Sequence, residues 1–203
     1  MTRPSILAFV LLLVALPLAA QTPAPLPVPA QGLAGQQVGV LPLTLVATDP
    51  ALQSDTLFAG FHDRRATLSW ADSLIGDALT ARAPEVKWVL PPQLRKIARR
   101  APGIVDDPDH MGQALLRSPK LKDVPDPLRA SLRNLMAVVG GRVAFVPAAL
   151  GFSRDADGSI RAELPLVAAD VRSGKVVWRS VAVGSGPTPA AALASALDAV
   201  LPI

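Results

Sequence analysis

Residues 142–183 read RVAFVPAALGFSRDADGSIRAELPLVAADVRSGKVVWRSVAV, and they carry the strongest fold signal in the chain. They hold three runs of strand-forming residues, at 142–150, 160–171 and 176–183. Between the runs lie the segments 153–159 (SRDADGS) and 172–175 (RSGK), whose aspartate, serine and glycine are typical of tight turns. Three strands joined by two short turns predict an antiparallel meander.

Upstream of the meander, two strands and a helix are predicted. Residues 37–46 (QVGVLPLTLV) form a nearly continuous apolar run, which favours one buried strand. Pro42 has no amide hydrogen to donate, so the strand should lie at an edge or pairing should stop there. Ser69 is expected to cap a helix that ends at Ala83, because apolar residues repeat between them at helical spacing. Residues 86–90 (VKWVL) predict the second strand.

The remaining regular segments are helical. Residues 93–100 predict a short helix, and a further helical piece is expected around Met111. Residues 126–141 begin with Asp-Pro and end with Gly-Gly, which favours a helix between them. An alanine-rich helix is expected over 187–201. The order predicts an α/β fold of the α+β kind: a mixed sheet with a C-terminal three-strand antiparallel meander, and helices packed on the sheet.

The N-terminus has the pattern of an export signal. Arg3 is followed by an uncharged apolar run at 6–18 (ILAFVLLLVALPL) and then by small residues up to Ala20. The run is short for a bilayer span, which needs roughly 20 residues, so cleavage after Ala20 is favoured over an uncleaved anchor. We therefore divide the chain into a signal peptide (1–20), a proline-rich linker (21–34) and a single α/β domain (35–203).

Composition limits the classes of function. The chain has no cysteine, so it forms no disulfide and is not a lipoprotein of the usual bacterial kind. Its formal net charge is +4 and only 4% of its residues are aromatic, without the interleaved basic and aromatic clusters of nucleic-acid binders. We predict no nucleic-acid partner and no cofactor.

The sequence offers no catalytic motif. His62 and His110 are the only histidines, and neither stands in an HExxH pattern; no serine stands in a G-x-S-x-G pattern. His62 and Asp63 supply two members of a hydrolytic triad without a nominated serine. The aspartates beside His110 favour a solvated acidic loop over a weak metal site; these are Asp106, Asp107 and Asp109. We therefore predict no catalytic residue and no metal ligand.

Two further segments have competing interpretations. Gly184-Ser185-Gly186 precedes a predicted helix and could cradle an anion, but no P-loop lysine follows, so a strand-to-helix corner is favoured. The densest basic cluster consists of Arg95, Lys96, Arg99 and Arg100. This cluster is either a solvated helix face or a possible partner-binding surface for an acidic protein or the anionic surface of a membrane.

Several of these segments resemble a known family. Residues 166–178 (LVAADVRSGKVVW) are similar to the "lvDvrtGevlW" stretch of a bacterial envelope group that includes CsgG, LpoB and the N-terminal domain of TolB. Residues 38–43 (VGVLPL) resemble the opening "vaVLPf" strand of that group, and residues 138–143 (VVGGRV) resemble its "vvGgrv" segment. The resemblance implies a non-enzymatic role in envelope assembly or secretion. Asp170 and Ser173-Gly174 are then expected to form a tight turn rather than a catalytic site.

The sequence thus predicts a periplasmic or secreted scaffold or regulator that acts through contacts with envelope proteins. The alternative is a small exported hydrolase or ligand-binding protein that uses His62, Asp63 or His110. A secreted structural protein without a specific partner is the third possibility.

Overall fold

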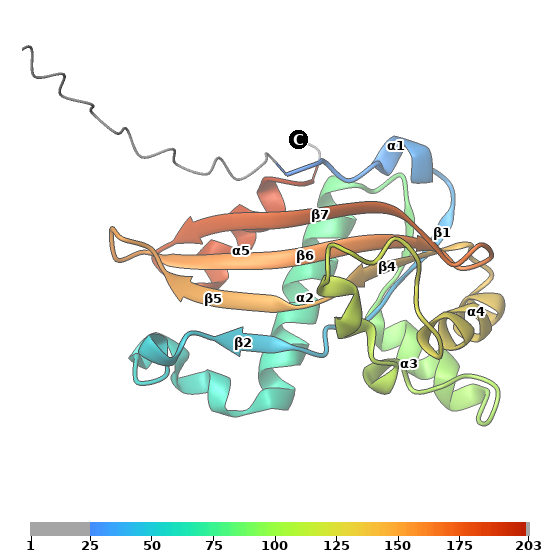
Figure 1. Ribbon diagram of the computed structural model, residues 1–203, viewed down its shortest axis with the longest axis horizontal. Coiled ribbons are helices and arrows are strands. Elements are labelled where there is room, and N and C mark those ends of the chain that lie inside the picture. The colour runs from blue at the N-terminus through green and yellow to red at the C-terminus, as the bar shows by residue number, and fades with distance from the viewer. Residues whose placement is uncertain (1–24, 202–203) are drawn as a thin grey trace, which may run out of the picture.

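The computed structural model describes residues 25–201, so the predicted signal peptide lies outside the described residues. Within that range seven strands form one mixed sheet with helices on both faces (Figure 1). The strands are β1 (Gln37–Val40), β2 (Val46–Thr48), β3 (Lys87–Val89), β4 (Val143–Pro147), β5 (Leu150–Arg154), β6 (Ile160–Asp170) and β7 (Lys175–Gly186). The α-helices are α1 (Ala30–Leu33), α2 (Arg64–Arg82), α3 (Pro91–Arg100), α4 (Leu128–Val139) and α5 (Pro189–Asp198). The predicted fold class is confirmed.

Strand β6 is the centre of the predicted meander. It pairs antiparallel with β7 on one side and with both β4 and β5 on the other. The expected single strand over 142–150 is wrong in detail, because β4 ends at Pro147 and a second strand, β5, begins at Leu150, the last residue of that run. Pro147 pairs with Leu166 and Gly151 pairs with Glu163, so the three residues 148–150 oppose the two residues 164–165, as in a β-bulge.

The predicted single strand over 37–46 is also divided. Strand β1 lies parallel to β3 and β4, whereas β2 lies parallel to β5. Between β1 and β2 the backbone leaves the sheet: the carbonyl of Pro42 accepts from Gln113 Nε2 at 2.9 Å, and the amide of Leu43 donates to Asp72 Oδ1 at 2.8 Å. Pairing stops at Pro42 as expected, and buried side chains take the place of ladder bonds.

Helix α2 begins earlier than predicted. The proposed cap Ser69 is wrong, since the Asp63 carboxylate caps the helix by accepting from the amide of Ala66 at 3.0 Å. Arg64 and Arg65 lie in the first turn. Because these residues are polar, the repeat of apolar residues does not reveal where the helix begins. The predicted end at Ala83 is confirmed.

The expected corner at Gly184-Ser185-Gly186 is wrong, because these residues belong to β7. A Cβ added at Gly184 would lie 2.1 Å from the amide nitrogen of Ala196 in α5. The glycine therefore lets α5 approach the sheet closely, which is a structural role rather than an anion cradle. Helix α5 starts after the Thr188 cap and ends at Asp198, short of the predicted end at 201.

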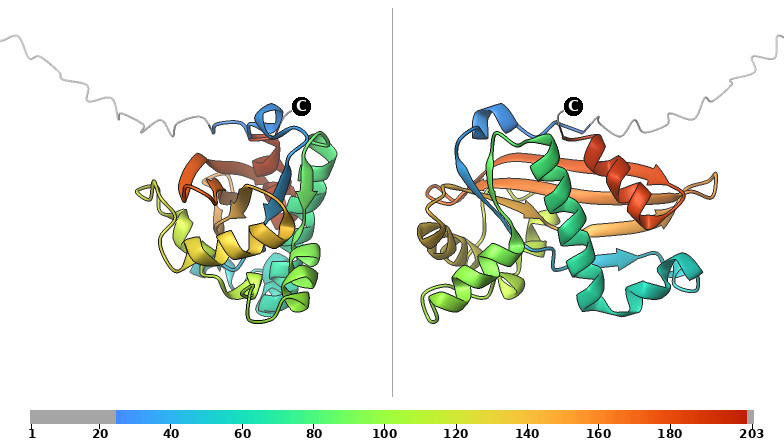
Figure 2. Two further views of the ribbon diagram at one scale, coloured as in Figure 1. Left: turned by 90° about the vertical axis from the view of Figure 1, so that its right-hand side faces the viewer. Right: turned by 180° about the vertical axis from the view of Figure 1, so that it is seen from behind.

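The sheet separates two hydrophobic cores. The first core lies between the sheet and helices α2 and α5, and the second lies between the opposite face and α3, α4 and residues 105–124 (Figure 2). Side chains of β6 alternate between them: Leu166 and Ala168 enter the first core, and Val167 and Ala169 enter the second. Both faces of β6 are therefore buried along this half of the strand.

Residues 102–125 hold the short 3-10 helices η3 (Pro108–His110) and η4 (Gln113–Arg117), the latter near the predicted helical piece at Met111. Arg179 of β7 donates to the carbonyls of Leu116 at 2.5 Å and Leu121 at 3.0 Å, and burial lowers the pKa of this arginine. These bonds hold the segment over the second core.

Part of segment 21–34 also packs on the domain. Val28, Ala30 and Leu33 are buried, and the Val28 amide donates to the carbonyl of Val200 at 2.7 Å. None of the helices within residues 25–201 combines the length and apolar character needed to cross a membrane.

Candidate functional site

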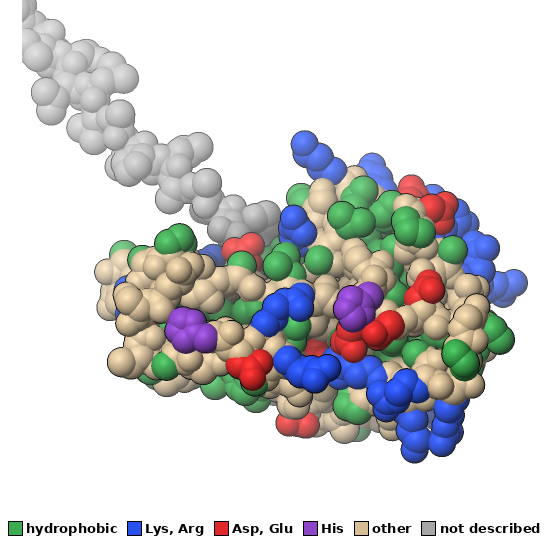
Figure 3. Space-filling model, turned by 90° about the horizontal axis from the view of Figure 1, so that it is seen from below, with side chains coloured by type: hydrophobic (Ala, Val, Ile, Leu, Met, Phe, Trp, Pro, Cys, Tyr) green, Lys and Arg blue, Asp and Glu red, His purple; other side chains and the backbone are tan. Residues whose placement is uncertain are grey.

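A cleft of about 810 Å³ opens where the chain leaves the carboxyl end of β1. Its sides are the first turns of α2, helix α3 and residues 105–110. Helix α2 packs in the first core and α3 in the second, so the cleft lies between elements from opposite faces of the sheet. Crevices at the carboxyl ends of strands are frequent ligand sites in α/β folds. Figure 3 shows basic side chains gathered beside acidic side chains and a histidine on this face.

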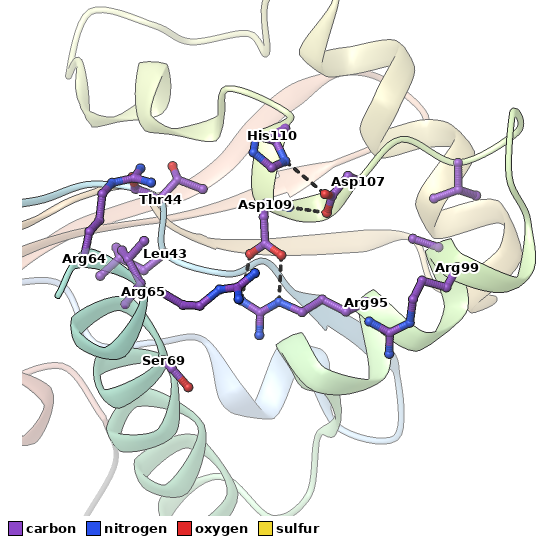
Figure 4. A pocket seen from close by; sticks show the side chains of 13 residues that line it. Leu43, Thr44, Arg64, Arg65, Ser69, Arg95, Arg99, Asp107, Asp109 and His110 are labelled. Atoms are coloured by element: carbon purple, nitrogen blue, oxygen red, sulfur yellow. Dashed lines mark hydrogen bonds and ion pairs between the residues drawn. The ribbon is translucent and has the colours of Figure 1, made fainter.

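Arg95 lies at the centre of the cleft, where Figure 4 shows it bonded to Asp109, and the buried Asp72 is its second carboxylate partner. Its Nε and Nη2 donate to Asp109 Oδ2 and Oδ1 at 2.8 and 2.7 Å, and Nη2 also donates to Asp72 Oδ2 at 2.9 Å. The Asp72 side chain is only 6% exposed. Burial raises the pKa of Asp72, against the opposing effects of the hydrogen bonds from the Leu43 amide and from Arg95. Asp72, on α2, thus links Arg95 of α3 to the backbone at Leu43, where the chain leaves the sheet between β1 and β2.

Asp107 and His110 form a second pair at the edge of the cleft. His110 Nδ1 lies 2.9 Å from Asp107 Oδ2, and the amide of Asp109 donates to Asp107 Oδ1 at 3.1 Å. The hydrogen bond from the Asp109 amide has the largest effect and lowers the pKa of Asp107. The contact with His110 lowers this pKa further, and burial of the carboxylate opposes both effects. The His110 side chain is 81% exposed. This pair therefore stabilises a surface turn.

Two arginines of the cleft have no partner in the part of the chain that the structure describes. Among residues 25–201, no side chain or carbonyl bonds to Arg65 or Arg99. Figure 4 shows these side chains entering the cleft from opposite sides, Arg65 from α2 and Arg99 from α3. Arg64, next to them, donates to the carbonyl of Thr44 at 2.8 Å. Arg65 and Arg99 are therefore available to an external acceptor.

The four basic residues predicted as a partner surface are divided by the helix. Arg95 and Arg99 are one turn apart on α3 and line the cleft. Lys96 and Arg100 are exposed and lie outside its lining. Sequence analysis did not find Arg65 or the supporting Asp72. The available signal was a pair of arginines in the first turn of a helix, where the helix dipole disfavours cations.

The residues of the alternative hydrolase prediction do not converge. His62 is exposed at the end of the 3-10 helix η2 (Thr56–His62), and Asp63 caps α2, so only His110 borders the cleft. The aspartates beside His110 also separate: Asp106 accepts from the Ser131 hydroxyl, Asp107 contacts His110, and Asp109 binds Arg95. Among the described residues, no His, Asp and Glu side chains are grouped to hold a metal ion.

Neither a protein-family model nor a curated protein sequence matches the chain. The solved structures to which the chain is similar at a low level include the following three. The LpoB C-terminal domain from Salmonella enterica is 16% identical, with a TM-score of 0.36 over 75% of this chain and 84% of that one. The PelC dodecamer from Paraburkholderia phytofirmans is 14% identical, with a TM-score of 0.35 over 82% and 89%. Lipoprotein GNA1162 from Neisseria meningitidis is 10% identical, with a TM-score of 0.33 over 74% and 81%. At this level the matches carry no conclusion about function.

Proposed function

We propose that the chain is an exported, non-enzymatic protein of the cell envelope that acts as a scaffold or regulator by binding another protein through the cleft. One observation carries the proposal: within the described part of the chain, Arg65 and Arg99 face the cleft without partners, while the acidic side chains of the cleft are bound to other residues. The predicted export signal and the family resemblance of residues 166–178 support an envelope location.

The chemistry of the cleft favours binding over catalysis. A general acid or base must be free to exchange a proton with a bound substrate. Asp109 is held by Arg95 and Asp107 by His110, while arginine stays protonated and cannot act as a base. Arginine instead recognises carboxylates through two parallel hydrogen bonds. The charged groups of the cleft without a partner among the described residues are thus arginines, which suit an acidic surface.

Photo-crosslinking in intact cells tests this function. A photoreactive amino acid at Ser69, which lines the cleft, should give one discrete adduct with another envelope protein. The same group at exposed Lys96, outside the cleft, serves as the control and should not give that adduct. The proposal is wrong if both positions give the same pattern, or if neither gives an adduct.

The hydrolase alternative retains one supporting observation, the contact between His110 and Asp107 at the edge of the cleft. It predicts that the purified protein cleaves model esters or peptides and that His110→Ala abolishes the cleavage. Figure 4 shows Ser69 and His110 at opposite ends of the cleft with the Arg95–Asp109 pair between them, which disfavours a serine–histidine nucleophile.

A further inference from the structure

We infer that the cleft recognises an acidic peptide segment with an apolar side chain between two carboxylates. This inference rests on the proposed function and names the chemistry of the partner. The carboxylates pair with Arg65 on α2 and Arg99 on α3, and the apolar side chain rests on the uncharged part of the lining.

The two cations define the first requirement. Arg65 and Arg99 come from different helices and enter the cleft from opposite sides (Figure 4). Arg95 is not counted as a third cation, because Asp72 and Asp109 already compensate its charge and accept from its Nε and Nη2 groups. A ligand therefore needs two separated anionic groups rather than one.

The uncharged lining defines the second requirement. Leu68, Ala98 and Val105 contribute apolar surface to the lining of the cleft. Burying an apolar side chain there is favourable, whereas a fully hydrated acidic segment would leave this surface in water. An apolar residue between the carboxylates meets both conditions.

The mixture of donors and acceptors distinguishes a peptide from a phosphate group. Beside the arginines, the lining offers the carboxylate of Asp107 and the hydroxyls of Thr44 and Ser69. A phosphate dianion presents acceptors almost exclusively, so it has no N–H group to donate to the Asp107 carboxylate. A peptide backbone supplies N–H donors for these acceptors together with its acidic side chains. The cleft therefore favours a peptide over a free phosphate or a phospholipid headgroup.

Fluorescence anisotropy with the exported full-length protein tests the inference. The probe is a labelled peptide with a Glu-Leu-Glu core, compared with a Gln-Leu-Gln core and a Glu-Ser-Glu core. We expect binding of the first peptide, and binding at least tenfold weaker for each of the other two, since each lacks one of the two requirements. Equal binding of all three peptides overturns the inference.

Protein variants locate the site. Arg65→Ala and Arg99→Ala should each weaken Glu-Leu-Glu binding about tenfold, the loss expected for one charge-assisted pair. Lys96→Ala and Arg100→Ala remove one positive charge each from α3, the helix that carries Arg99, and should leave binding unchanged. All four side chains are exposed, so far-UV circular dichroism should confirm an unchanged fold. Equal losses in all four variants would mean nonspecific attraction and contradict the inference.

Two further outcomes separate the inference from the proposed function. If inorganic phosphate or vesicles containing phosphatidylglycerol bind more tightly than the peptide, the ligand class is wrong. If the Ser69 position crosslinks to an envelope protein while Glu-Leu-Glu does not bind, the protein-binding function stands and the peptide chemistry fails. If the peptide binds without any crosslink in cells, the chemistry stands and the envelope function fails.

Discussion

The Asp170 side chain stabilises the turn between β6 and β7. Its Oδ1 accepts from the amides of Arg172 and Ser173 at 2.9 and 3.0 Å, and its Oδ2 accepts from Arg142 Nε at 2.7 Å. Gly174 completes the turn with a φ of +74°, a conformation that glycine adopts without strain. This turn was predicted from the sequence, because its determinants are local.

The charge of Asp170 should give a pH-dependent contribution to stability. Burial opposes ionisation, but the bonds from Arg142 and the two amides outweigh it and lower the pKa of Asp170 below 3.8. The charged form therefore stabilises the folded state above that value, and the contribution is lost as pH falls through the folded pKa. Asp170→Asn should lower the free energy of unfolding by about 1 kcal/mol near pH 7. Urea denaturation should show this difference shrinking as the pH falls from 3.8 through the folded pKa of Asp170, and a constant difference would contradict the assignment.

At the same scale, the residues of the cleft could be predicted only in part. Arg95 and Arg99 were singled out because they are close in sequence and share a helix. Asp72 and Leu43 are 29 positions apart, and no periodicity connects them. Their contact depends on the packing of α2 against the β1–β2 break, which the sequence pattern does not encode locally.

Among the elements, the packing of α5 on β7 depends on a glycine inside a strand. Gly184→Ala places a methyl group against the α5 backbone, which cannot move aside as a flexible side chain would. We expect a loss of about 3 kcal/mol in the free energy of unfolding, at the upper end of the cost of overpacking.

Gly151→Ala is the matched control for this substitution. Gly151 also lies in a strand, β5, but the nearest atom to an added Cβ is 3.9 Å away. Thermal unfolding should therefore show a large fall in Tm for Gly184→Ala and little change for Gly151→Ala. Similar Tm values for the two variants would contradict the close approach of α5.

Strand and helix positions were largely predictable, whereas of the two strand breaks only the first was. The apolar runs over 37–46 and 142–150 each have the composition of one strand, and each divides into two. Pro42 marked the first break. The second requires an extra residue opposite β6, and this register shift depends on a partner strand rather than on the run itself.

For the whole molecule, the central prediction is export. The N-terminal pattern predicts cleavage after Ala20, so the mature chain should begin at Gln21. Cell fractionation followed by N-terminal sequencing should find this form outside the cytoplasm. Replacing two leucines of the 6–18 run with arginine should block processing, while the same change at exposed Leu26 should not. Unprocessed wild-type protein in the cytosol would contradict the prediction.

The central position of β6 determines how the domain unfolds. This strand is hydrogen-bonded to three others, and its side chains pack alternately in the two cores. Neither core can therefore unfold while the other stays folded. The domain should melt as a single cooperative unit. Unfolding curves recorded by tryptophan emission and by far-UV ellipticity should then coincide. Two fragments produced by dividing the chain at the β5–β6 hairpin should fold only when they are mixed.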